Sequence, residues 1–183
     1  MKADAKKRVS RNVMSTLIVL LTLGVYADDY MVTVPQGETW SWSQAESATG
    51  GATSGKRLVK AGRGLLMGAD LSSKGFSELV INEGVYEATA LNQLPVVSAK
   101  SKLTVESGAT LRIGFSLAQT STTINVAVGG EGADGEGGAI VFTASSAMGA
   151  KYGPNWTLTS DTVFYAKGES RIVDFSCNAY GAT

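Results

Sequence analysis

The 183-residue chain is predicted to be an all-β protein: a parallel β-helix (β-solenoid) of about five to six coils after an N-terminal signal helix. Three observations indicate this class. Short alternating apolar runs recur at a regular interval after residue 27, and a glycine follows each of the first five. The composition combines 22 glycines with 3 prolines, and charged residues make up 17% of the chain. A disordered chain would carry more charge and fewer large apolar residues.

Residues 1–27 have the composition of a secretory signal peptide. A basic segment that ends at Arg11 precedes an apolar run over residues 13–25, which closes with Val25-Tyr26-Ala27. We therefore expect export, with cleavage after Ala27. The alternative is a retained anchor, but spanning a bilayer needs about 20 apolar residues and this run is shorter. The solenoid domain is then predicted over residues 28–183.

The formal net charge of zero combines two different segments. Residues 1–27 contain five basic residues and one acidic residue, so the remainder holds 11 of the 16 basic and 15 of the 16 acidic residues, a net charge of −4. Such a surface should repel phosphate backbones, so we expect no nucleic-acid partner. Histidine is absent and Cys177 is the only cysteine, which excludes an internal disulfide and a His/Cys metal cage. Cys177 is predicted to be a small apolar residue.

The repeated unit is an alternating run followed by a glycine. The runs cover residues 32–34, 58–60, 79–81, 103–105 and 124–126, and successive glycines, from Gly37 to Gly129, are 25, 22, 24 and 21 residues apart. Two later runs, over residues 139–144 and 156–166, continue the pattern less regularly. A single coil cannot bury its own apolar face, whereas stacked coils bury a continuous core.

Alternation also predicts which side chains stack on one another. Two columns are expected, each with one residue per coil: the first holds Leu58, Leu79, Leu103 and Ile124, and the second holds Lys60, Ile81, Val105 and Val126. A second apolar pair follows the glycine in several coils, as in Leu65-Leu66, and the glycine between the two strands permits a sharp corner. Residues 47–55 and 129–138 are predicted to be loops that leave the stack.

An antiparallel sandwich is the competing interpretation. Its strands usually recur every 8–12 residues, and the individual strands would allow that spacing. The apolar–glycine–apolar unit of about 23 residues favours the solenoid. No segment after Ala27 shows a helical period, apart from one short turn expected over residues 88–93.

Two segments carry a family resemblance. The residues Leu58-Val59-Lys60-Ala61-Gly62-Arg63-Gly64-Leu65-Leu66-Met67-Gly68, then Leu79-Val80-Ile81-Asn82-Glu83-Gly84, follow the forms Leu-x-Lys-x-Gly-x-Gly-x-Leu and Leu-x-Ile-x-x-Gly. They resemble the autotransporter-associated β-strand repeat over about 30 residues, although the sequence of the loop over residues 69–75 differs from the one usual in that family. Residues 128–141 and 158–164 also look like large exported proteins with such repeats.

The resemblance implies a right-handed parallel β-helix displayed outside the cell as an autotransporter-type passenger or adhesin-like stalk. On this basis the chain is expected to be a non-catalytic structural or adhesin-like surface protein, with extracellular glycans or cell surfaces as partners. Membrane contact would be limited to the signal segment or to a missing C-terminal anchor. We expect the chain to be the N-terminal part of a longer solenoid.

The glycine-rich segment over residues 129–136 nearly matches the calcium-binding nonapeptide of repeat toxins. Its carboxylates, Glu131, Asp134 and Glu136, are of the type that calcium prefers. However, Glu136 stands where that motif has an apolar residue, and the segment occurs once. A solvated loop is therefore the favoured interpretation, and no metal or cofactor is expected.

Two tryptophans are candidates for stacking on sugar rings. Trp40 and Trp42 alternate and, in a strand, would share one face. The alternative is a hydrophobic plug at the N-terminal end of the solenoid, and we favour the plug because a solenoid requires covered ends.

The alternative function is a carbohydrate-active or glycan-binding β-helix. Polysaccharide lyases and hydrolases need acids and a base or basic residue on one face. The available candidates are Asp161, Asp174, Lys167 and Arg171, which show no recognisable spacing. The sequence therefore contains no residue that we predict to be catalytic.

Overall fold

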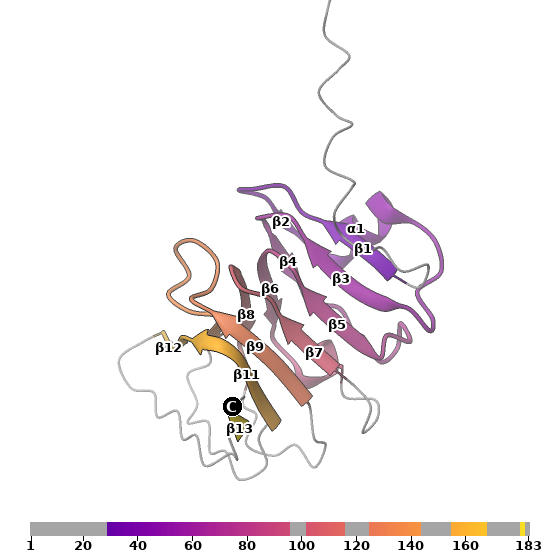
Figure 1. Ribbon diagram of the computed structural model, residues 1–183. Coiled ribbons are helices and arrows are strands. Elements are labelled where there is room, and N and C mark those ends of the chain that lie inside the picture. Colours follow the sequence, from indigo (N-terminus) through magenta and orange to yellow (C-terminus); the bar gives the residue numbers. More distant parts are fainter. Residues whose placement is uncertain (1–28, 96–101, 116–124, 144–154, 168–179, 182–183) are drawn as a thin grey trace, which may run out of the picture.

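The strands lie in two parallel sheets, which they enter alternately. The computed structural model describes residues 29–95, 102–115, 125–143, 155–167 and 180–181. One sheet has the order β1-β3-β5-β7-β9-β11-β13 and the other has the order β12-β10-β8-β6-β4-β2 (Figure 1). Each coil thus adds one strand to each sheet, and the parallel β-solenoid predicted from the sequence is confirmed.

The first sheet contains β1 (Asp29–Thr33), β3 (Arg57–Ala61), β5 (Glu78–Ile81), β7 (Lys102–Val105), β9 (Asn125–Gly130), β11 (Asn155–Thr162) and β13 (Tyr180–Gly181). The second sheet contains β2 (Thr39–Trp40), β4 (Leu65–Met67), β6 (Gly84–Ala88), β8 (Ala109–Ile113), β10 (Ile140–Phe142) and β12 (Phe164–Ala166). One α-helix, α1 (Trp42–Thr49), and one 3-10 turn, η1 (Leu91–Gln93), complete the described elements. The short turn expected over residues 88–93 is present as η1.

The core columns follow the alternation of the first sheet. Leu58 pairs with Leu79, which pairs with Leu103, and Lys60, Ile81 and Val105 form the neighbouring column, as predicted. In β9 the prediction was wrong by two residues, because Val126 pairs with Leu103 and Val128 pairs with Val105. A shift of two residues leaves every side chain on the same face, so the apolar pattern alone could not distinguish the two registers.

The second sheet closes the core from the opposite side. Leu66, Tyr86, Leu111 and Ile140 pair in register through successive coils and are fully buried. Together with the columns of the first sheet they form one continuous apolar cluster. Removal of this apolar surface from water is the main stabilising contribution, and it exists only once the coils are stacked.

Helix α1 contradicts the expectation that no helix follows residue 27, and it takes up residues 47–49 of the predicted loop over residues 47–55. Its signal is a capping box: Ser41 Oγ accepts from the Gln44 N–H at 3.4 Å, and Gln44 Oε1 accepts from the Ser41 N–H at 2.8 Å. Ala45 is the only buried residue of α1, so the helix has no broad apolar stripe. The spacing of apolar residues in the sequence therefore does not reveal α1.

The corner between β5 and β6 requires glycine. Gly84 has a φ of 69°, and a Cβ on it would lie 2.5 Å from the Gly62 carbonyl oxygen. Both the left-handed backbone and the close approach of the preceding coil exclude a side chain. The sequence analysis inferred that glycine forms the corner after each apolar run. At Gly84 the positive φ and the nearby backbone explain why.

The described residues contain no helix that is long and apolar enough to cross a membrane. The predicted signal peptide over residues 1–27 lies outside the described residues, as do Cys177, Asp174 and Arg171.

Candidate functional site

A groove of about 640 Å³ runs across the corners of successive coils, and we call it the corner groove. Its lining begins at the turn before β2, crosses the beginnings of β4, β6 and β8, and ends at the loop between β9 and β10. Neighbouring strands lie about 4.8 Å apart, so the three steps from β2 to β8 give the groove a length of about 14 Å. The β9–β10 loop is the orange loop that projects beside β8 in Figure 1.

Two apolar side chains that point away from the core lie beneath the corner groove. Leu66 and Tyr86 point inward and are fully buried, so their neighbours Leu65 and Val85 point outward. Leu65 pairs with Val85, and both line the groove. Val85 is only 6% exposed, so Leu65 supplies most of the apolar surface of these two residues. Six charged residues contribute to the lining: Glu38, Arg63, Glu83, Arg112, Asp134 and Glu136.

The first ionic contact of the groove joins two consecutive corners. Arg63 Nε donates to Glu83 Oε1 at 2.7 Å, with 60% and 45% of the two side chains exposed. This hydrogen bond and the charge of Glu83, together with the charge of Asp134, raise the pKa of Arg63. Arg63 is therefore a permanent cation on the groove wall, with acidic groups on two sides.

The second ionic contact holds the β9–β10 loop against the solenoid. Arg112 donates from Nε and Nη2 to the two carboxylate oxygens of Glu136, both at 2.7 Å. The hydrogen bond with Glu136 is the main reason that the pKa of Arg112 is raised. A bidentate pair of this kind fixes orientation as well as distance, so it sets the position of one groove wall.

A side chain of β8 ties two parts of the same loop together. The buried Thr110 hydroxyl donates to the Gly138 carbonyl at 2.9 Å and accepts from the Ala133 N–H at 2.8 Å. Gly132 has a φ of 93°, and a Cβ there would lie 2.1 Å from the Gly138 carbonyl oxygen. The glycines that suggested a calcium motif thus have a conformational role in this loop.

The three calcium candidates are not gathered around one point. Glu131 and Asp134 are exposed, and both oxygens of Glu136 accept from Arg112. In the part of the chain that the structure describes, no three His, Cys, Asp or Glu side chains form a group that could hold a metal ion. The predicted loop is shorter than residues 129–138, because Gly129 and Gly130 belong to β9.

Trp40 and Trp42 do not share a strand face, which corrects the sequence prediction. Trp40 ends β2, whereas Trp42 begins α1, because Ser41 between them is the N-cap of the helix. Trp40 Nε1 donates to Glu38 Oε2 at 2.6 Å, and Glu38 lines the corner groove. The two indoles therefore have different surroundings.

Trp42 belongs to an aromatic cluster that covers the first coil, the N-terminal plug of Tyr30, Trp42 and Phe76. The Trp42 ring lies 5.9 Å from the rings of Tyr30 and Phe76, and those two rings are 5.6 Å apart. The Trp42 indole N–H is buried and makes no hydrogen bond within the described residues. Trp42 is half-buried, and these ring contacts make it part of the protein's own packing.

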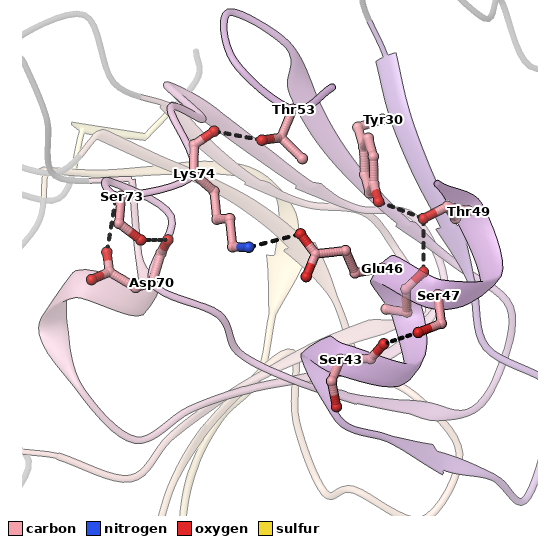
Figure 2. Close-up of polar contacts among 10 residues, drawn as sticks. Tyr30, Ser43, Glu46, Ser47, Thr49, Thr53, Asp70, Ser73 and Lys74 are labelled. Carbon is pink, nitrogen blue, oxygen red and sulfur yellow. Dashed lines mark hydrogen bonds and ion pairs between the residues drawn. The ribbon is translucent and has the colours of Figure 1, made fainter. Parts of the chain in front are cut away.

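Polar contacts hold α1 over this plug. Figure 2 shows Lys74 directed at Glu46 of the helix, with an Nζ–Oε1 distance of 2.7 Å, and Thr49 Oγ1 donating to Tyr30 Oη at 2.6 Å. Thr53 Oγ1 donates to the Lys74 carbonyl at 2.7 Å, so the segment after the helix is tied to the same loop. The helix thus acts as a cover for the first coil.

Two of the residues considered for polysaccharide cleavage fall within the described residues. Asp161 lies in β11 and Lys167 follows β12; both are exposed, and neither lines the corner groove. The sequence analysis instead overlooked Glu38, Arg63, Glu83 and Arg112. A usable signal existed, because Arg63 stands between Gly62 and Gly64 and Glu83 directly precedes Gly84, which places charged side chains beside the corners.

Comparison with known proteins finds no match to a family model, to a curated protein or to a solved structure.

Proposed function

We propose that this chain is a non-catalytic, exported structural or adhesin-like β-solenoid of the autotransporter-passenger type. The observation that carries the proposal is the direction of its ionic contacts. Each ion pair among the described residues joins side chains that are 20 to 28 positions apart, which is about one coil: Arg57–Asp29, Arg63–Glu83, Lys74–Glu46 and Arg112–Glu136. Charged groups are thus used to tie one coil to the next.

This use of charge suits a stalk. Arg57 makes a two-pronged contact with Asp29, with both N–O distances at 2.9 Å, and the Asp29 side chain is only 4% exposed. A repeat protein gains stability chiefly from such contacts between neighbouring units, so the stack resists bending and local opening. A catalytic centre would instead direct its charged groups toward one reacting position.

Export is the part of this proposal that is tested first. The full chain would be expressed in a Gram-negative bacterium and followed by cell fractionation and N-terminal sequencing. We expect the exported product to begin at Asp28, because cleavage is predicted after Ala27. A Leu17→Arg and Leu20→Arg double variant, which interrupts the apolar run, should stay inside the cell. An uncleaved wild-type chain in the cytosol would contradict the proposal.

A carbohydrate-binding or carbohydrate-active β-helix is the second candidate, and the corner groove favours it. Charged and glycine residues make up most of the groove's lining, and its volume lies within the range of about 300–1,000 Å³ that is usual for ligand pockets. Incubation with polysaccharides separates the two forms of this candidate. An enzyme would shorten the polymer, whereas a binding protein would retain it intact.

A further inference from the structure

We propose that strand β3 fixes the register of the first three coils through two cations, Arg57 on its outer face and Lys60 in the core. The inference concerns the stacking of the coils and goes beyond the proposed function. It starts from what the apolar pattern leaves open. A shift of β3 by two residues against β1 would place Leu58 opposite Val32 instead of Tyr30, and every side chain would keep its face. Alternation alone therefore permits more than one stack.

Arg57 ties β3 to the preceding coil. It pairs with Asp29 in the sheet and donates from Nε and Nη2 to the two carboxylate oxygens, both at 2.9 Å. The Asp29 side chain is only 4% exposed. A shift of two residues would place Val59 opposite Asp29 in one direction, and Met31 opposite Arg57 in the other. Either shift loses the two parallel hydrogen bonds, and it leaves a carboxylate with little access to water without its cation, which is strongly destabilising.

Lys60 ties the same strand to the following coil. It is fully buried, and its Nζ donates to the Glu83 carbonyl at 2.8 Å and to the Gly62 carbonyl of its own coil. Glu83 lies at the corner that follows β5. Because a strand advances by about 3.3 Å per residue, a shift of two residues moves this carbonyl by about 6.6 Å relative to Nζ. The ammonium would then be buried with one of its two acceptors missing, which is costly.

The two contacts lie on opposite faces of β3 and reach opposite neighbours. Arg57 reaches back to β1, whereas Lys60 reaches forward to the corner after β5. A shift of β3 against either neighbour therefore breaks a contact that involves a buried charge. Selection of one register among several is the best attested role of buried polar groups in apolar packing. The core stabilises the stack, and these two residues select its alignment.

Disulfide trapping in the full chain, with Cys177→Ser as the background, reads the register of β1 and β3. Met31→Cys with Val59→Cys joins residues that are paired in the structure. Met31→Cys with Ala61→Cys, and Thr33→Cys with Val59→Cys, report shifts of two residues in the two directions. Paired Cα atoms lie about 5 Å apart, whereas those of the offset pairs lie about 8 Å apart, beyond the reach of a disulfide at about 7 Å. We expect the in-register pair to cross-link at least about tenfold more than either offset pair.

Replacement of both members of the outer ion pair is the first variant. Asp29→Val with Arg57→Val leaves no buried charge unpaired and places β-branched residues in both strands, so the chain should remain folded. The offset cross-links should then rise at least about fivefold relative to the in-register one. The matched control is Arg63→Val with Glu83→Val, which removes an exposed ion pair between coils. It should leave the cross-links between β1 and β3 unchanged.

Lys60→Met tests the contact with the following coil, and it decides the proposal if the valine pair does not fold. Val59→Cys with Val80→Cys is the in-register pair of β3 and β5. Val59→Cys with Asn82→Cys, and Ala61→Cys with Val80→Cys, report the two shifts. Methionine fills a similar volume without a charge, so these offset cross-links should also rise at least about fivefold.

Circular dichroism establishes which variants are folded. A contribution to stability alone would lower the melting temperature of the variants and leave the ratio of cross-links unchanged. Three results would overturn the proposal: offset cross-links as abundant as in-register ones before the charges are changed, an unchanged ratio in either folded variant, or an equal rise in Arg63→Val with Glu83→Val.

Discussion

Lys60 Nζ donates a hydrogen bond of 2.8 Å to the backbone carbonyl of Glu83 in the following coil. The same ammonium also donates to the carbonyl of Gly62 in its own coil. Lys60 is fully buried in a core column whose next members are Ile81 and Val105. A charged side chain therefore occupies an apolar position, where it satisfies the backbone of two consecutive corners.

Replacement of Lys60 by methionine should destabilise the chain. Methionine fills a similar volume but leaves the Gly62 and Glu83 carbonyls without their donor, at a cost of about 1–3 kcal/mol. Urea unfolding at neutral pH measures the change in the free energy of unfolding. Lys102→Met removes an exposed lysine from β7 and should change that free energy by less than about 0.5 kcal/mol. Equal effects of the two substitutions would contradict this role of Lys60.

The stability of the wild type should rise with pH above about 8. Burial lowers the pKa of Lys60 from 10.5 to about 8, although the charge of Glu83 opposes this shift. Between these two values the unfolded chain binds more protons than the folded chain, so the free energy of unfolding increases with pH. The slope is at most about 1.4 kcal/mol per pH unit.

The quantity to follow is the free energy of unfolding of the wild type minus that of Lys60→Met. Urea unfolding measures both from pH 7.5 to 9.5. Higher values are avoided because burial raises the pKa of Tyr86. Above pH 10 the unfolded tyrosine ionises while the folded one keeps its proton, which lowers stability in both proteins. A difference that stays constant or falls as pH rises would show that the Lys60 pKa is not lowered.

Gly84→Ala should cost much more stability than Gly108→Ala. Both glycines have a positive φ, of 69° and 83°, so each alanine carries a backbone cost of about 1–2 kcal/mol. At Gly84 the new Cβ would also lie 2.7 Å from Lys60 Nζ and from the Gly64 carbonyl oxygen, which adds about 1–3 kcal/mol of overpacking. At Gly108 it would meet nothing within 4 Å. Thermal unfolding measures the melting temperatures of both variants, and we expect the lower one for Gly84→Ala. Equal melting temperatures would refute the role of the corner contact.

The two ion pairs of the corner groove should differ in strength. The side chains of Arg112 and Glu136 are 24% and 14% exposed and form a bidentate contact, whereas Arg63 and Glu83 are 60% and 45% exposed. Double-mutant cycles replace each arginine by methionine and each glutamate by glutamine. The coupling free energy between Arg112 and Glu136 should be about 1–2 kcal/mol. For the second pair we expect a clearly weaker coupling, because water and salt screen two exposed side chains. The reverse order would show that the β9–β10 loop is not held by Arg112.

The sequence predicts the repeated unit well and the irregular parts poorly. Leu58, Leu79 and Leu103 stack as expected because alternation and the glycine spacing act together over three coils. Helix α1 was missed because it buries only Ala45 and therefore lacks a periodic apolar stripe. Its capping box at Ser41 and Gln44 was visible in the sequence and would have separated Trp40 from Trp42.

The candidate site was predictable only in part. Asp134 and Glu136 stood out because they lie in a glycine-rich segment, yet the sequence could not show that Glu136 faces Arg112, 24 residues earlier. Glu38 and Arg63 were not singled out, because neither belongs to a recognisable ligand motif. Their common position on one groove depends on the register between coils.

What the sequence by itself determined is the unit that repeats: an alternating strand, a glycine corner and a second strand, which can bury its apolar face only by stacking. What the tertiary structure decided is how neighbouring coils meet. Alternation has a period of two and cannot distinguish registers that differ by two residues, as the pairing of Val126 with Leu103 shows. The burial of Lys60, the coil-to-coil ion pairs and the corner groove all depend on that register, because each joins residues about one coil apart.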